Sequence, residues 1–196
     1  MYNQQRFVNK IIYRDVNRLM GLGLGYMARI KTSSFYISTE VTDILATATS
    51  STLDISQYVD APSGQAILVE EVQFCWFFEN DFLPLRSTSA TDYAWTAQLK
   101  DSTGGALINP NSEDLVSQSH YLADGQGGVY SEDDVMPDVM GYAAGEGRLV
   151  ISSNLQLTAM GSAALANASC CARIRCRVVT LDKNDWIALA LQSVAE

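Results

Sequence analysis

The stretch from residue 168 to 181 constrains the fold of this chain more than any other. Its even-numbered positions are small or apolar, as at Cys170, Ile174 and Val178. Successive side chains of a β-strand point to opposite faces of a sheet, so a period of two over this length predicts a half-buried strand. The odd-numbered positions of the other face carry three arginines, Arg173, Arg175 and Arg177.

Most of the chain after residue 32 has the same texture. Runs rich in β-branched and aromatic residues alternate with turn residues such as Gly, Pro, Asn and Asp. Within 66–79 the apolar positions change from odd to even across Glu70 and Glu71, which indicates a β-bulge or a bend. The expected strands are residues 34–39, 52–59, 66–79, 93–100, 106–108, 115–122, 147–157 and 168–181.

About eight antiparallel strands with helices only at the ends predict an all-β fold, a single jelly roll or β-sandwich. Residues 109–147 are rich in glycine and acids, so they are expected to be mostly loop, with 115–122 as a strand or a short helix. Asp182 precedes an apolar run and has Asp185 three positions later, which predicts a capped helix over 182–195.

The first 31 residues differ from the rest in charge and in pattern. They hold six basic residues and one acidic residue, a net charge of +5. Residues 32–196 have a net charge of −14, which gives −9 for the whole chain. Apolar residues at helical spacing over 3–20 predict an amphipathic helix, and Gly21, Gly23 and Gly25 predict a joint after it. The chain is therefore expected to be an arm (1–31) followed by a β domain (32–196).

The arm's basic residues recur every four positions and form a stripe beside the apolar one. Three partners fit such an arm. It packs on its own domain or on a neighbouring subunit, lies on an anionic membrane surface, or neutralises nucleic-acid phosphates. The basic stripe consists of Arg6, Lys10, Arg14 and Arg18.

Three readings also remain for the arginines of 168–181. An adjacent strand carries acids opposite them, a neighbouring subunit supplies the acids, or the strand binds nucleic acid. The last is disfavoured because aromatic residues that would stack on bases are not interleaved with the arginines.

The four cysteines show no spacing typical of a metal site, and the chain has one histidine. Free thiols suit assembly in a reducing cytosol. Cys170 and Cys176 share a face but lie roughly 20 Å apart along a strand, and Cys171 points to the other face. We therefore expect no disulfide among these three.

Catalysis finds little support in the sequence. His120 has no nucleophile motif beside it, and the carboxylates that a glycosidase pair would need are spread along the chain. An acidic loop over 132–138 is a calcium candidate without EF-hand spacing. We therefore expect no catalytic residues, no cofactor and no resident metal. The candidate glycosidase acids are Glu70, Glu71, Glu79, Asp81 and Asp92.

The arm, the glycine joint, the strands and the passage from Arg173–Leu181 into a terminal helix resemble the single-jelly-roll major capsid proteins of tailless icosahedral viruses. The likeness is strongest to capsid proteins of viruses with an internal membrane. It implies a virion protein, assembled in the host cytoplasm, that builds an icosahedral shell with copies of itself and other capsid proteins. It also implies no small-molecule substrate and an arm that faces the membrane or genome. The basic residues of the arm and the three strand arginines would make the assembly or interior contacts.

Two other functions compete with the shell. A β-sandwich binding module, either carbohydrate-binding or adhesin, would expose aromatic side chains such as Tyr93, Trp95 and Tyr130 in a shallow groove. A hydrolase on the same scaffold would need paired carboxylates with shifted pKa values in a pocket.

Overall fold

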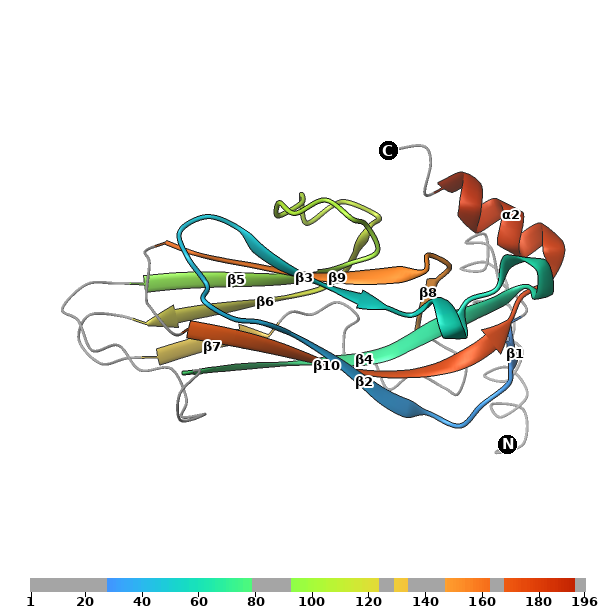
Figure 1. Cartoon of the computed structure of the whole chain (residues 1–196), viewed down its shortest axis with the longest axis horizontal. Coiled ribbons are helices and arrows are strands. Elements are labelled where there is room, and N and C mark those ends of the chain that lie inside the picture. The colour runs from blue at the N-terminus through green and yellow to red at the C-terminus, as the bar shows by residue number, and fades with distance from the viewer. Residues whose placement is uncertain (1–27, 79–92, 124–128, 134–146, 163–167, 193–196) are drawn as a thin grey trace, which may run out of the picture.

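The computed structural model describes residues 28–78, 93–123, 129–133, 147–162 and 168–192. These residues form two antiparallel β-sheets that face each other and one C-terminal helix (Figure 1). The predicted helix over 3–20 and the glycine joint lie outside the described residues. Within the described part, no helix has the length and apolar character that crossing a bilayer requires.

The first sheet has β10 (Ala168–Thr180) at its centre. β4 (Gln65–Phe78) pairs with one side of β10, and β8 (Arg148–Val150) continues the sheet beyond β4. The other side of β10 pairs with β2 (Phe35–Val41) and with the short β1 (Arg29–Ile30). The last residues of the sequence-defined arm are therefore part of this sheet.

The second sheet contains strands from the middle of the chain and from its later part. β9 (Asn154–Gly161) and β5 (Tyr93–Lys100) pair with each other inside this sheet. β3 (Thr49–Asp54) lies outside β9, while β6 (Leu115–Ala123) and β7 (Val129–Asp133) continue the sheet beyond β5.

The pairing follows a simple order when β1 and β7 are set aside. The first strand pairs with the last, β2 with β10, and the second with the second-last, β3 with β9. The third then pairs with the sixth, β4 with β8, and the fourth with the fifth, β5 with β6. Taken from the chain ends inwards, these four pairs of described strands lie alternately in the first and the second sheet.

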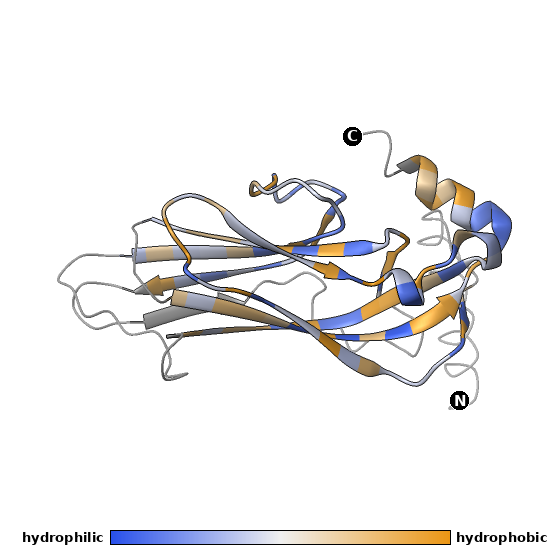
Figure 2. Cartoon of the chain, in the orientation of Figure 1, coloured by the Kyte–Doolittle hydropathy of each residue, from blue (hydrophilic) through white to orange (hydrophobic). Residues whose placement is uncertain are grey.

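The main core lies between the sheets, and Figure 2 shows hydrophobic residues interspersed with hydrophilic ones along the strands that surround it. Trp76 from one sheet and Trp95 from the other both contact Tyr121, with ring centroids 6.1 and 5.6 Å apart. Trp76 Nε1 donates a hydrogen bond to Ser119 Oγ at 3.0 Å, so its buried polar atom is satisfied.

A second, smaller cluster lies at one end of the first sheet. Leu68 and Val179 are buried there, and Trp186 and Leu189 of α2 (Lys183–Gln192) pack against it. Asp182 Oδ1 accepts hydrogen bonds from the backbone N–H groups of residues 184 and 185, both at 2.9 Å. The predicted cap of the C-terminal helix is therefore confirmed.

The predicted bulge is confirmed as well. The register between β4 and β10 shifts between Arg175 and Cys176, so that Glu71 lies opposite Arg175 and Val69 opposite Cys176, with Glu70 as the extra residue. The change from odd to even apolar positions in the sequence corresponds to this bulge. One extra residue shifts the positions that face the core by one along the strand.

Three strand assignments were wrong. Residues 106–108 form no strand, because the buried Lys100 Nζ donates to the carbonyls of Gly104 and Ala106 and holds this segment as a loop. The expected strand 147–157 is two strands with a turn between them, and the expected strand 52–59 ends at Asp54. The stretch taken as loop contains β7, which pairs with β6.

Candidate functional site

The candidate site is the outer face of the first sheet, which we call the arginine face. It carries Arg173, Arg175 and Arg177 of β10, because the alternate residues of the same strand, such as Ile174 and Cys176, are fully buried in the core. β10 is a central strand, so side chains from β2 and β4 flank the arginines on both sides.

Two of the arginines are neutralised by acids of β4. Arg175 Nη1 lies 3.0 Å from Glu71 Oε2 and its Nε lies 3.5 Å from Glu70 Oε2. Arg177 Nη2 pairs with Glu70 Oε1. The Glu70 side chain is only 7% exposed, so its charge depends on these partners more than a surface carboxylate would.

Ser34 completes this network. Its hydroxyl donates to Glu70 Oε2 at 2.6 Å and accepts from Arg177 Nη2 at 3.1 Å. The acids-opposite alternative predicted from sequence is therefore confirmed for Arg175 and Arg177. Both guanidinium groups form ion pairs within the chain.

Arg173 is different, because its guanidinium carbon lies 4.3 Å from the centre of the Tyr36 ring. Arg173 is exposed, and Tyr36 is 50% exposed. A guanidinium group that lies on an aromatic face still has the N–H donors at its own rim available to hydrogen-bond another molecule. Arg173 and Tyr36 are thus the part of the arginine face best placed to meet another molecule.

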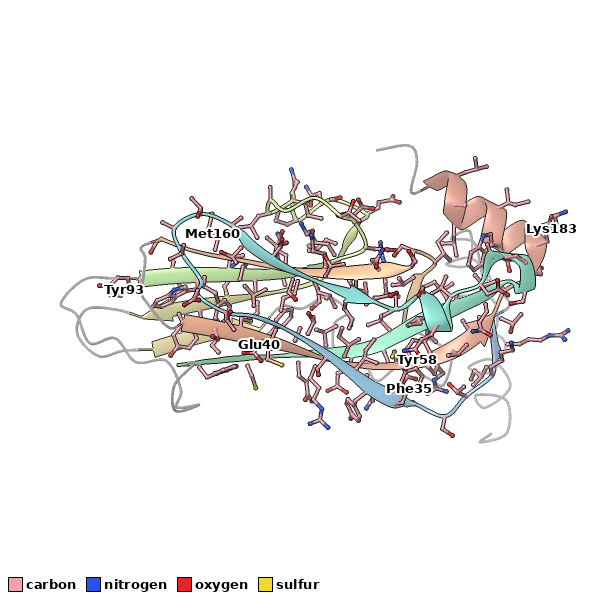
Figure 3. All side chains as sticks on the ribbon, viewed as in Figure 1. Phe35, Glu40, Tyr58, Tyr93, Met160 and Lys183 are labelled. Carbon is pink, nitrogen blue, oxygen red and sulfur yellow. The ribbon has the colours of Figure 1, made fainter. Side chains whose placement is uncertain are left out.

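A row of three polar side chains crosses the same face beside Arg173. Cys171 of β10 lies opposite Glu40 of β2 on one side and opposite Cys75 of β4 on the other. Figure 3 labels Glu40 in this row. Desolvation raises the pKa of the Cys171 thiol first, and the nearby Glu40 and Cys75 raise it further. All four cysteines are free in the structure, and burial raises the pKa of Cys176 to about 12.

The other sequence candidates are not gathered into a site. His120 Nδ1 lies 3.0 Å from Thr96 Oγ1 across two strands, which is a structural contact. Glu70 and Glu71 are bound to arginines, while Glu79, Asp81 and Asp92 lie outside the described residues. Over the described ranges, no cluster of three His, Cys, Asp or Glu side chains is arranged to hold a metal.

Several candidates fall where side chains are not described. Glu132 and Asp133 belong to β7, whose backbone alone is described, and Asp134 and Asp138 lie beyond it. The basic stripe of the arm also lies outside the described residues: Arg6, Lys10, Arg14 and Arg18.

The aromatic groove expected for a carbohydrate-binding module does not include Trp95. Trp95 is 1% exposed and stacks on Tyr93 inside the sandwich, with centroids 5.5 Å apart. Trp95 lies on the core face of β5. The sequence of a single strand shows which residues share a face, but it does not show which of the two faces is buried. The side chain of Tyr130 is not described.

Sequence reasoning missed a cleft at one end of the sandwich. It has a volume of about 470 Å³ and lies between the β5–β6 loop and the β8–β9 turn, with Asp101, Asp114 and Ser152 among its lining residues. Desolvation raises the pKa of Asp101 to about 6. In the sequence, Asp101 belongs to a turn-rich run, and nothing there signals that the carboxyl would be partly enclosed.

No protein-family model matches the chain, and no curated protein sequence matches it either.

Proposed function

We propose that the chain is a structural, non-enzymatic virion protein: a single jelly roll that assembles with copies of itself into an icosahedral capsid. The observation that carries this proposal is the strand pairing. A jelly roll is a two-stranded ribbon folded over so that strands pair from the chain ends inwards. The order β2-β10-β4-β8 in one sheet and β3-β9-β5-β6 in the other fits that description strand by strand.

The arginine face supports a subunit that meets other protein. Its central charges are neutralised within the subunit, so burying it against a neighbour leaves few unpaired charges. The exposed Arg173 and Tyr36 are residue types enriched in protein interfaces. The contrast between a basic arm and a β domain of charge −14 gives copies of the chain a complementary electrostatic contact.

In this proposal the arm faces the particle interior. It contacts an internal membrane, the packaged genome or an adjacent subunit through its basic and apolar stripes. The protein is assembled in the host cytoplasm, where free thiols persist. It needs no small-molecule substrate and no cofactor for this role.

The cleft beside Asp101 favours a second candidate function, a β-sandwich binding module of the carbohydrate-binding or adhesin type. Loop-lined clefts at the end of a sandwich are common ligand sites. The burial of Trp95 weakens this candidate, because sugar recognition usually exposes an aromatic platform.

Light scattering on the purified full-length chain, with electron microscopy of the same sample, tests the proposal. We expect assemblies of megadalton mass with regular shells. A protein that stays monomeric across concentration and salt, and that binds a defined glycan, would favour the binding module instead.

A further inference from the structure

Cys75 and Cys171 face each other across the two central strands of the first sheet. They are directly opposite in the antiparallel register of β4 and β10. Both lie on the arginine face, where Cys75 is exposed and Cys171 is partly exposed. Cys170 and Cys176 are buried on the opposite face of β10, so the sheet separates them from this pair.

The spacing of paired strands suits a disulfide. Residues directly opposite in an antiparallel sheet have Cα atoms about 4.5–5.5 Å apart and Cβ atoms about 4.5–5.5 Å apart. A disulfide needs Cα atoms about 4.4–6.8 Å apart and Cβ atoms about 3.5–4.5 Å apart. To form the disulfide, the two Cβ atoms must therefore approach each other by about 1 Å or less, and the register of the strands does not change.

We propose that Cys75 and Cys171 form a reversible redox pair that closes into a cross-strand disulfide when the protein meets an oxidising environment. The small strain of drawing the strands together makes the bond easier to reduce than a relaxed disulfide. The same property keeps the pair open in a reducing cytosol.

The closing reaction uses a low-molecular-weight disulfide such as oxidised glutathione. The Cys75 thiolate attacks one sulfur of the reagent, forms a mixed disulfide and releases one thiolate. The Cys171 thiol loses its proton, attacks the Cys75 sulfur and releases the second thiolate. Two protein thiols are oxidised, one disulfide reagent is reduced to two thiols, and two protons leave the protein.

Burial of Cys171 and the nearby Glu40 both slow the second step. The Glu40 carboxylate lies opposite Cys171 and disfavours the thiolate, so the exposed Cys75 reacts first and Cys171 resolves the adduct. The carboxylate slows closure without blocking it, because thiol exchange still proceeds through the small thiolate fraction.

The chemistry of the pair is independent of the proposed function, whereas its use in a particle rests on that function. In the proposed particle, the disulfide would form in subunits whose arginine face is still reached by a small oxidant when the surroundings become oxidising. The disulfide would join β4 to β10 within each subunit, so it would stiffen the sheet without linking neighbours.

The test uses the purified full-length chain in a glutathione buffer of varied redox ratio, followed by intact mass and peptide mapping. We expect a loss of about 2 Da, a mapped Cys75–Cys171 bridge and a rise in Tm of about 5–10 °C, all reversed by a dithiol reductant. Cys75→Ser and Cys171→Ser should abolish all three changes, while Cys170→Ala should retain them. Glu40→Gln should speed closure about two- to fivefold.

Three results would overturn the inference: a glutathione adduct on Cys75 that never closes, a bridge between two chains, or a bridge that includes Cys170. The mass of the assembly does not enter this test. If the bridge forms in a chain that never assembles, the redox pair is supported and the capsid proposal is wrong. If the chain assembles but the bridge never forms, the capsid proposal is supported and the redox pair is wrong.

Discussion

Glu70 and Glu71 are neighbours in the sequence, yet both contact Arg175 from the same side of the sheet. Adjacent residues of a regular strand point to opposite faces, so a regular β4 would bury one of them in the core. The bulge removes that conflict by inserting one residue opposite the Arg175–Cys176 junction. One extra residue thus supplies two carboxylates to one arginine face.

The two acids should differ in their contribution to stability. Glu70→Gln removes the charge that serves both Arg175 and Arg177 from a side chain that is 7% exposed, so it should lower the free energy of unfolding by about 2–3 kcal/mol. Glu71→Gln is the matched control. Its side chain is 26% exposed and contacts Arg175 alone, so the loss should stay below about 1 kcal/mol. Urea unfolding at neutral pH measures both, and equal losses would contradict the unequal roles.

Assembly should depend on Arg173 more than on the arginines that are already paired. Arg173→Ala should leave the Tm within about 2 °C of the wild type, because an exposed side chain adds little to stability, and should reduce the assembled fraction several-fold. Arg173→Lys retains the charge and loses the planar group, so its assembled fraction should lie between those of the wild type and Arg173→Ala. Sedimentation of the variants decides the matter. Normal assembly of Arg173→Ala would exclude this contact from the interface.

The Asp101 carboxyl should make stability fall as the pH rises. Its pKa in the folded protein is raised to about 6 from 3.8, so the folded state holds the proton more tightly than the unfolded state does. The resulting stability is present below pH ~4 and is lost as the pH rises through about 6. Asp101→Asn should therefore be more stable than the wild type at pH 7.5, by about 1–3 kcal/mol, and should flatten the dependence between pH 4 and 7. The exposed Asp43→Asn is the control, and a pH profile unchanged by Asp101→Asn would refute the assignment.

Two truncations separate the arm from the sheet. Deleting residues 1–27 should leave a soluble, cooperatively melting β domain that fails to assemble. Deleting residues 1–31 should also lower the Tm, because it removes β1 from the edge of β10 and Ala28 from the cluster under α2. Thermal melts and light scattering report the two effects. If the shorter deletion already unfolds the domain, the arm belongs to the core, and if it assembles normally, the arm has no part in the shell.

Local features of this fold could be predicted wherever the apolar side chains follow a clear pattern along the chain. The alternation around Ile174 fixes β10, the parity change at Glu70 fixes the bulge, and Asp182 fixes the start of α2. Each of these depends on residues close together in the chain, where backbone geometry dictates which side chains share a face.

Features that depend on distant residues are not readable in the same way. The segment after Lys100 has apolar residues typical of a strand, but the buried ammonium group binds its carbonyls and turns it into a loop. The opposition of Cys75 and Cys171 follows from a register between strands that are separated by most of the domain. Enclosure of Asp101 likewise needs the β8–β9 turn to arrive beside it.

The central position of β10 has a consequence for biosynthesis. β2 and β4 both take their main pairing from β10, which leaves the ribosome well after either of them, so the first sheet cannot close until β10 has emerged. At about 5–20 residues per second, β2 waits roughly ten seconds for its partner, with its edge and apolar face open to water. Such non-local pairing makes folding slow and exposes the nascent chain to aggregation. A cell that makes this protein in quantity should therefore gain soluble yield from chaperones that shield the early strands until β10 has emerged.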